Sequence, residues 1–277
     1  MISGKTALYG VVGHPIGHSR SPAMQNAAFA HAGVDAVYVA LPVEPGRLPD
    51  ALRGAHALGF RGLNVTVPHK QDALAACGTL DPVARAVGAV NTLRRAGEGW
   101  EGFNTDAPAT LQLLDGAGLV RGGRVLLLGA GGVARAAAWA ALAMGCELVV
   151  AARRAEAADA LCAEALAAAP PGARATSIRW DRASAESGRA NAIVNATTIG
   201  LPAHGQAELP PLSLTAGVVV VDYVYGDTAF VRAARAAGAR LVTGEELLVR
   251  QGALAFSLWL GQAAPEAVMS AAVGGKR

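Results

Sequence analysis

The sequence predicts an α/β protein with two domains. Short apolar runs rich in Val, Ile and Leu alternate with alanine-rich stretches of helical length, and this alternation is typical of parallel sheets with helical connections. The length of 277 residues is about twice that of a common single domain of roughly 150 residues. A glycine-rich break at 116–123 is followed by a new strand-helix-strand pattern, which indicates where the second domain starts its own sheet.

The first half is expected to form five strands and at least two helices. Ser21-Pro22 predicts a helix over 22–32, with Ser21 as the N-cap and Pro22 in the first helical position. Asp81-Pro82 repeats this helix-start signal. The strands are expected at 7–12, 37–41, 62–65, 89–95 and 100–103.

A helix over 106–117 is expected to bridge the two domains. We place the first domain at 1–106 and the second at 107–245. The second domain is expected to contain a helix over 134–144 and strands at 124–128, 147–152, 192–196, 218–222 and 240–242. The last helix, at about 245–260, includes Leu247, Leu254, Phe256 and Trp259, which is apolar enough to require a large packing partner.

Composition excludes several classes of protein. Apolar residues make up 52% of the chain and charged residues 16%, which excludes a disordered polyelectrolyte. A net charge of +3 without a basic block longer than a pair argues against nucleic-acid binding. The three cysteines lack C-x-x-C spacing, so no disulfide framework or metal site is expected. The apolar runs are too short to span a membrane and no cleavable signal is evident, so we expect a soluble cytoplasmic protein.

A dinucleotide-binding turn is predicted at the start of the second domain. Gly129-x-Gly131-x-x-Ala134 matches G-x-G-x-x-G/A, a weak motif alone, but a strand precedes it and a helix follows. The glycines allow a tight turn and close approach of the backbone to a pyrophosphate at the helix N-terminus. The alternative is an ordinary strand-to-helix turn in a glycine-rich chain. We expect a Rossmann-like domain.

Two arginines indicate which dinucleotide binds. NAD sites usually carry an acidic residue at the end of the second strand, whereas arginine suits the 2′-phosphate of NADP. Here that strand ends in Ala152-Arg153-Arg154-Ala155, and two guanidinium groups can bind a phosphate through charge-assisted hydrogen bonds. The alternative is that they are only solvated at the strand end. NADP is favoured.

Polar groups gather where strands of the first domain should end. They occupy three segments at 14–22, 64–70 and 102–106, and also Asn91-Thr92. The carboxyl ends of strands in α/β sheets form ligand-binding crevices. Lys70 is the only lysine away from the chain ends, among 24 basic residues. Hydroxyls, amides, an amine and a carboxylate suit a small polyhydroxylated acid.

These segments resemble the shikimate dehydrogenase family over nearly the whole chain. The matching blocks are P-I-x-H-S-x-S-P at 15–22, N-V-T-x-P-x-K at 64–70, G-A-V-N-T at 88–92, N-T-D at 104–106, G-A-G-G at 129–132, N-A-T at 195–197, Asp222-x-x-Tyr225, and the Gln251-Gly252 region with Phe256 and Trp259. The first two are the most specific. Gln25 stands where the family commonly has His, and Ala109 where Gly is typical.

The resemblance implies NADPH-dependent reduction of 3-dehydroshikimate to shikimate, a step toward chorismate and the aromatic amino acids. It also implies a substrate-binding α/β domain with a mixed sheet, a Rossmann-like NADP-binding domain, and C-terminal helices at about 246–277 that return to the first domain. The implied partner is a small molecule, and the chain is expected to be a monomer or homodimer.

The resemblance further assigns roles to individual residues. Lys70 and Asp106 are implied as the catalytic pair. The implied substrate-binding residues are Ser19, Ser21, Asn64, Thr66, Asn91, Tyr225 and Gln251. The implied cofactor-binding residues are Gly129, Ala130, Gly131, Gly132, Val133, Arg153, Arg154, Thr197, Tyr223 and Gly244.

Lysine suits the chemistry, because an ammonium both stabilises a developing alkoxide and donates a proton to it, whereas arginine keeps its protons. Structural alternatives stay open: Ser21 and Asp106 as helix caps, Asn64, Thr66 and Asn91 as partners of strand-end backbone, and Lys70 as a solvated residue. Three other functions also stay open: a quinate/shikimate dehydrogenase with broader substrate or NAD use, a substrate-sensing regulator without catalysis, and a methylenetetrahydrofolate dehydrogenase.

Overall fold

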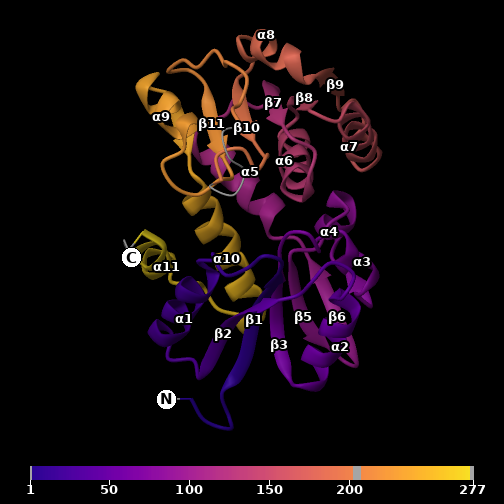
Figure 1. Ribbon diagram of the computed structural model, residues 1–277, viewed down its shortest axis with the longest axis vertical. Helices are drawn as coiled ribbons and strands as arrows, with labels where there is room; N and C mark the ends of the chain where they lie inside the picture. Colours follow the sequence, from indigo (N-terminus) through magenta and orange to yellow (C-terminus); the bar gives the residue numbers. More distant parts are fainter. Residues whose placement is uncertain (1, 202–206, 275–277) are drawn as a thin grey trace. The chain divides into compact units, whose positions relative to one another are not determined.

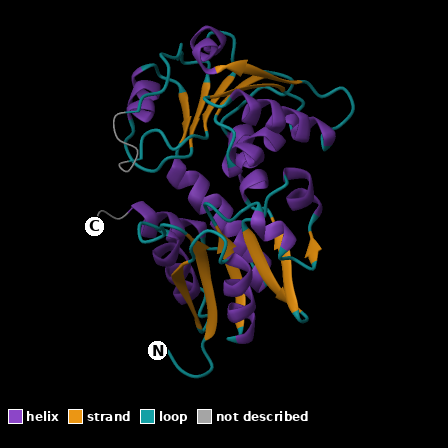
Figure 2. Ribbon diagram, turned by 45° about the vertical axis from the view of Figure 1, so that its right-hand side comes forward, coloured by secondary structure: helices purple, strands orange, loops and turns teal. Residues whose placement is uncertain are grey.

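The computed structural model describes residues 2–201 and 207–274. The chain divides into two compact units. The first unit comprises residues 1–105 and 248–277, and the second comprises residues 106–247. Figure 1 labels the elements of both. Each unit has a six-stranded sheet with helices packed on it, so the predicted α/β class is confirmed (Figure 2).

The sheet of the first unit is mixed. Its strands are β1 (Ala7–Gly13), β2 (Ala36–Pro42), β3 (Phe60–Val65), β4 (Thr79–Leu80), β5 (Thr92–Ala96) and β6 (Gly99–Phe103), in the order β2-β1-β3-β5-β6-β4. Strands β1, β2 and β3 are parallel, whereas β5 runs antiparallel to β3 and β6. Asn64 therefore pairs with Thr92, and Thr92 with Phe103, so the end of β3, the start of β5 and the end of β6 share one edge.

Two helical layers cover this sheet. Helices α2 (Leu48–Ala57), α3 (Asp72–Ala75) and α4 (Pro82–Val87) contribute to one core with Leu63, Leu93 and Trp100. On the other face lie α1 (Ser21–His31) and the C-terminal part of α10 (Gly244–Leu260), followed by α11 (Glu266–Gly274), which packs on α1. The Trp259 ring of α10 packs against the Tyr9 ring, with centroids 5.1 Å apart and the ring planes tilted by 40°, and its Nε1 donates to Leu93 O at 3.0 Å. The predicted return of the C-terminal helix to the first sheet is confirmed.

The second unit has a wholly parallel sheet. Its strands are β7 (Arg124–Leu128), β8 (Glu147–Ala152), β9 (Ala175–Arg179), β10 (Ala192–Asn195), β11 (Val219–Asp222) and β12 (Arg240–Val242). The order β12-β11-β10-β7-β8-β9 places the first strand of the unit, β7, at the centre with β10 on one side and β8 on the other. This reversal of strand order beside β7 is the Rossmann arrangement, and ligands bind at such a switch point.

Alternate residues of each strand fill two cores. Leu127 and Val150 face α5 (Asp106–Gly116), α6 (Gly132–Ala143) and α7 (Ala155–Ala167). Leu126 and Val149 face the opposite core, which includes α8 (Ala183–Ser187) and α9 (Ala229–Ala236). A short 3-10 helix, η1 (Trp180–Arg182), joins β9 to α8. The central strands β7, β8, β10 and β11 are buried on both faces and are therefore mostly apolar along their length.

One predicted helix start is wrong by one residue. Ser21 is not the N-cap of α1, because Arg20 already has helical φ and ψ and its carbonyl accepts from Met24 N. Ser21 is the first helical residue, and its amide donates to Ser19 Oγ at 3.3 Å. Asp81 does cap α4 as predicted, since its side chain accepts from Val83 N and Ala84 N. Ser21 is thus not used as a capping side chain.

Candidate active site and cofactor-binding turn

A buried network of amides and hydroxyls occupies the shared edge of the first sheet. Asn64, the fifth residue of β3, donates from Nδ2 to Thr92 Oγ1 at 3.0 Å and to Asn91 O at 3.2 Å. Tyr38 Oη donates to Asn64 Oδ1 at 2.7 Å. Asn91 Oδ1 accepts from Thr105 N at 2.7 Å, and Asn91 Nδ2 donates to Thr105 Oγ1 at 3.0 Å. The structure thus brings the predicted pair Asn64 and Asn91 together.

Hydrogen-bond capacity shows what these amides can still bind. Both amide hydrogens of Asn64 are used, but Oδ1 has a second lone pair. Asn91 has a donor left instead of an acceptor. Its Oδ1 already accepts several hydrogen bonds, whereas within the part of the chain that the structure describes only one of its two Nδ2 hydrogens is used, in the bond to Thr105 Oγ1. Among the described residues, Asn64 therefore offers an acceptor and Asn91 offers a donor to a ligand. That complementary pair suits hydroxyl groups, each of which donates and accepts.

Lys70 lies in the turn that follows β3. It is buried, at 8% exposure, and its carbonyl accepts from Val90 N at 2.8 Å. Thr66, which is half-buried, accepts at its carbonyl from His69 N at 2.9 Å. These main-chain bonds fix the turn against the start of the 88–92 segment. The burial of Lys70 and its fixed turn argue against a lysine that is merely solvated at a helix start.

The remaining predicted substrate residues of this unit lie on α1 and α10 or just before α1. Ser19 is half-buried and Ser21 is buried. Gln251 is on α10 and donates from Nε2 to Leu248 O of its own helix at 2.9 Å. Gln25, one turn after Ser21, donates from Nε2 to Gly252 O at 2.9 Å, and its buried Oε1 has no partner among the described residues.

Asp106 belongs to the second unit, where it begins α5. It is buried, at 8% exposure. One turn later, Thr110 contacts Asp106 O and the hydroxyl of Tyr223, which directly follows β11. The pKa of Tyr223 is raised by burial and by the nearby charge of Asp106, although the hydrogen bond to Thr110 opposes this. The phenol therefore stays protonated at neutral pH.

The glycine turn after β7 has the geometry that a dinucleotide needs. Gly129 has φ +108°, and a β carbon there would lie 2.9 Å from Ala196 O and 3.1 Å from the Thr197 side chain. Gly131 is the N-cap of α6, is exposed, and has open space where a β carbon would stand. The turn thus packs tightly against the residues that follow β10, whereas no atom of the described residues, apart from the chain neighbours of Gly131, lies within 4 Å of the β-carbon position at Gly131. The next residues, Gly132 and Val133, are half-buried in the first turn of α6, and Ala130 is half-buried before it.

Arg153 and Arg154 lie at the end of the second strand of the Rossmann-like unit, between β8 and α7. Both are exposed. Neither guanidinium has a hydrogen-bond or ion-pair partner within residues 2–201 and 207–274, and Arg154 occupies the N-cap position of α7 without a side-chain cap bond. The two side chains are free to bind an anion, which is the charge requirement of a 2′-phosphate.

A second buried network links the ends of β10 and β11. Asn195 Nδ2 donates to Asp222 Oδ1 at 2.9 Å, and Thr197 Oγ1 donates to Asn195 Oδ1 at 2.6 Å. Asp222 also accepts from Val224 N at 3.0 Å and from Thr228 Oγ1 at 2.7 Å. Burial raises the pKa of Asp222, although these hydrogen bonds lower it. The network positions the predicted residue Thr197 beside Gly129.

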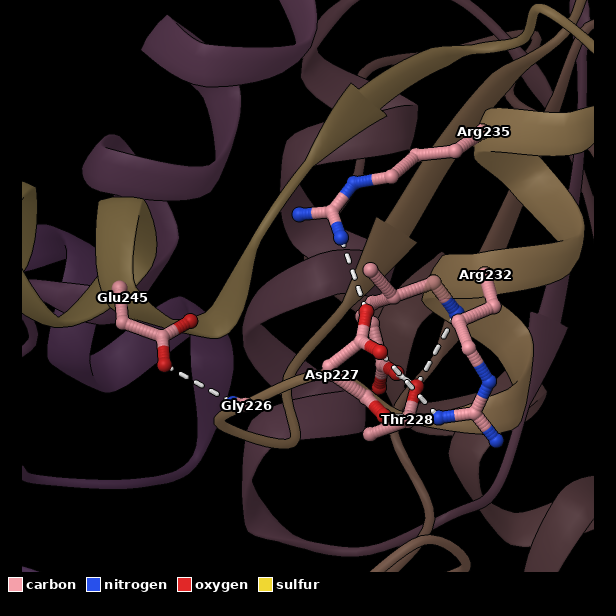
Figure 3. A network of polar contacts seen from close by, with 8 residues as sticks. Gly226, Asp227, Thr228, Arg232, Arg235 and Glu245 are labelled. Atoms are coloured by element: carbon pink, nitrogen blue, oxygen red, sulfur yellow. Dashed lines mark hydrogen bonds and ion pairs between the residues drawn. The ribbon is translucent and has the colours of Figure 1, made fainter.

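The loop after β11 carries Tyr225 and is held by several hydrogen bonds and ion pairs (Figure 3). Gly226 N donates to Glu245 Oε1 at 2.8 Å, and Arg235 pairs with Asp227 at 2.8 Å. Arg232 also binds the Asp227 side chain, at 3.3 Å. Gly244 is in close contact, because a β carbon there would lie 2.7 Å from Val224 O and 2.9 Å from the Tyr225 ring. Two predicted residues, Tyr225 and Gly244, therefore meet.

Several residues of these networks were not predicted as site residues from the sequence, among them Tyr38, Thr105, Thr110, Thr228 and Glu245. Thr105 is next to Asp106 in the N-T-D block, which is a local signal. Tyr38 and Thr110 act on partners 26 and 113 residues away, and no local pattern indicates such contacts.

The described residues show neither a reactive thiol nor a metal-binding cluster, and none of their helices could span a membrane. Burial raises the pKa of Cys77 and Cys162 to about 11, so neither thiol supplies a nucleophilic thiolate at neutral pH. No cluster of three potential metal ligands occurs in the described part of the chain. Within residues 2–201 and 207–274, no helix has the length and apolar character required to cross a bilayer.

Comparisons with known proteins agree along the whole chain. A family model described as shikimate dehydrogenase substrate binding domain matches residues 11–93, and one described as shikimate 5'-dehydrogenase C-terminal domain matches residues 244–273. The shikimate dehydrogenase (NADP(+)) of Anaeromyxobacter sp. (strain K) is 65% identical over 273 residues, which cover 99% of this chain and 98% of that protein.

Solved structures show the same similarity. A shikimate 5-dehydrogenase from Thermus thermophilus, in complex with NADP(H) and shikimate, is 37% identical, with a TM-score of 0.83 and coverage of 97% of this chain and 98% of that one. A quinate dehydrogenase from Corynebacterium glutamicum, in complex with NAD, is 30% identical, with a TM-score of 0.86 and coverage of 96% and 98%.

Proposed function

Because the chain belongs to the shikimate dehydrogenase family, we propose that it catalyses the reversible NADPH-dependent reduction of 3-dehydroshikimate to shikimate. The observation that supports this most is the buried Lys70, whose carbonyl accepts from the amide of Val90, the residue that precedes Asn91 of the amide network. The set of donors and acceptors matches a ring that carries a ketone and hydroxyl groups.

The cofactor-binding turn fits NADPH. Gly129 and Gly131 leave the backbone accessible at the N-terminus of α6, and Arg153 and Arg154 supply two cations for the 2′-phosphate. Ala130, Gly132, Val133, Thr197, Tyr223 and Gly244 complete the proposed lining. When bound, NADPH supplies the hydride.

Lys70 is the proposed proton donor. As negative charge develops on the carbonyl oxygen, its ammonium stabilises that charge and transfers a proton to the oxygen, giving the hydroxyl of shikimate. Asp106 accepts a hydrogen bond from the same hydroxyl, so the pair Lys70 and Asp106 fixes the reacting oxygen. In the direction of oxidation, the same proton transfer runs in reverse, from the substrate hydroxyl to the Lys70 amine.

The other side chains orient the substrate. Asn64 accepts from a ring hydroxyl through its free Oδ1 lone pair, Asn91 donates through its free Nδ2 hydrogen, and Gln251 binds another hydroxyl. Ser19, Ser21, Thr66 and Tyr225 hold the carboxylate end. We place the domain boundary near Asp106 and expect a cytoplasmic enzyme that is a monomer or homodimer.

The test is steady-state oxidation of shikimate and quinate, each with NADP and with NAD. We expect the highest kcat/KM for shikimate with NADP. Shikimate methyl ester is expected to be a poor substrate, because the serine hydroxyls lose their carboxylate partner. A quinate/shikimate dehydrogenase is the second candidate, favoured by the similarity to the quinate dehydrogenase structure. Equal kcat/KM for quinate with NAD supports this second candidate, and no turnover of either acid contradicts both.

A further inference from the structure

Two hydroxyl groups of the second unit lie in a row that ends on the main chain of Asp106. Thr110 Oγ1 lies 2.7 Å from Asp106 O and 2.5 Å from Tyr223 Oη. Thr110 is fully buried on α5, and the main chain of Tyr223 is held by a bond from its amide to Asn195 O at 3.1 Å. The row therefore runs from the end of the β10 and β11 strands to the first turn of the helix.

Proton counting fixes the direction of this row. A carbonyl oxygen only accepts, so the Thr110 hydroxyl donates to Asp106 O. Thr110 has one hydroxyl proton, so the proton in the second contact comes from Tyr223. The direction is Tyr223 to Thr110 to Asp106. Because the phenol proton is used, Tyr223 Oη has only acceptor capacity left for any ligand.

A bond from a helical threonine to the carbonyl four residues earlier is common in itself. The second contact is what distinguishes this one. It reaches from α5 to a residue 113 positions later, beyond the sheet strand β11, and it joins the helix that begins with Asp106 to the Rossmann sheet. The Tyr223 phenol also lies within range of the Asp106 charge, so Asp106 is near both the Thr110 end and the Tyr223 end of the row.

Building on the proposed function, we propose that Tyr223 is a positioning residue that holds Asp106 in its catalytic orientation through the hydroxyl of Thr110. This role differs from direct cofactor binding by the Tyr223 hydroxyl, because that proton is already donated. A misplaced catalytic carboxylate lowers the rate of the chemical step more than it lowers substrate binding.

The test compares single-hydroxyl variants. Tyr223→Phe and Thr110→Val are each expected to lower kcat for shikimate oxidation by about 5- to 20-fold, the effect of one buried hydrogen bond, while KM for NADP changes by less than about twofold. The double variant is expected to be no slower than the worse single variant, because both break the same row. Thr110→Ser keeps the hydroxyl and is expected to restore most of kcat. Thr176→Val, on exposed β9, is the matched control and is expected to leave kcat unchanged.

The outcomes separate this inference from the proposed function. Turnover of shikimate by the wild-type enzyme is measured first, and its absence contradicts the proposed function. If the wild type turns over and Tyr223→Phe raises KM for NADP with kcat unchanged, Tyr223 binds cofactor and the positioning role is wrong. Additive losses in the double variant, or a Thr110→Ser variant as slow as Thr110→Val, also contradict it. Circular dichroism melting of each variant shows whether lost folding explains a lost rate.

Discussion

At the scale of single residues, Lys70 gives the sharpest prediction. Lys70→Ala is expected to lower kcat by about 10²–10⁴, the usual range for a positioned acid or base, whereas shikimate affinity measured by calorimetry changes much less, because the lysine acts chiefly in the transition state. Lys70→Arg is not expected to restore turnover, since guanidinium keeps its charge but does not release a proton at neutral pH. An arginine variant with near wild-type kcat would show that Lys70 is only an electrostatic anchor.

The second prediction at this scale concerns Arg153 and Arg154. Replacing both with Ala is expected to raise KM for NADP by at least about tenfold and to change KM for NAD by less than about threefold, because a charge-assisted phosphate contact contributes more than a neutral hydrogen bond. Arg179→Ala is the matched control, because Arg179 is an exposed arginine at the end of β9 that is already paired with Asp181. Equal effects on both cofactors contradict the assignment.

Sequence reasoning found residues whose chemistry is local and missed those whose partners are distant. Lys70 is conspicuous in the sequence as the only interior lysine, although its catalytic role is implied by the family resemblance and stays a prediction. Asp81 was predictable as a helix cap because capping depends on the next three residues. The helix cap at Ser21 was wrong, because the turn before α1 lets Arg20 adopt helical angles one residue earlier. The roles of Tyr38 and Thr110 depend on contacts that only the folded chain creates.

At the scale of secondary-structure elements, burial on both faces made the central parallel strands easy to predict. The edge strand β9 was not predicted, because its sequence Ala-Thr-Ser-Ile-Arg is only partly apolar and none of its residues is fully buried. The limits of β7, β8 and β12 agree with the prediction, because each consists of one charged residue followed by an uninterrupted apolar run. The strand predicted at 89–95 begins only at Thr92, since Ala89 N bonds back to Ala84 O and Val90 N to Lys70 O. Helix α7 was not predicted as a separate element, although its alanine-rich sequence fits the alternation of strands with alanine-rich helices.

The junction of β11 and the following loop gives a prediction about pH. Burial raises the pKa of Asp222 above its ordinary value of 3.8, so the folded chain holds this proton more tightly than the unfolded chain. The contribution of Asp222 to the free energy of unfolding therefore decreases as pH rises from about 3.8 through the raised pKa and then stays constant. Asp222→Asn is expected to remove that part of the pH dependence.

The same variants separate charge from hydrogen bonding. Asp222→Asn keeps an acceptor for Asn195 and Val224, so we expect stability at pH 7 to change by less than about 1 kcal/mol. Asp222→Ala leaves buried donors without an acceptor and is expected to cost about 2–5 kcal/mol. Urea denaturation at several pH values between 4 and 8 measures both effects. An Asn variant with the same pH profile as the wild type would show that Asp222 is not the group responsible.

At the scale of the whole chain, α10 connects the two units, since residues up to Leu247 belong to the second and those from Leu248 to the first. The family resemblance predicted that this helix packs on the first unit. The apolar residues of the helix predicted only that it packs against something large. Its docking in the first unit depends on a glycine: a β carbon on Gly62 of β3 would lie 2.4 Å from Nε1 of Trp259. The absence of a side chain at Gly62 thus makes room for the indole.

Gly62→Ala is therefore expected to destabilise the protein by about 2–4 kcal/mol, because the indole must move off Tyr9 and lose its hydrogen bond to Leu93 O. Gly54→Ala is the control: Gly54 is exposed within α2 and has open space at its β carbon, so alanine there is expected to add about 0.5–1 kcal/mol. Urea denaturation followed by tryptophan fluorescence measures both changes.

Since Gln251 is on the same helix, Gly62→Ala is also expected to raise KM for shikimate more than KM for NADP. A Gly62→Ala variant as stable as the wild type, with both KM values unchanged, would show that the packing of Trp259 against Gly62 does not determine how α10 binds the first unit.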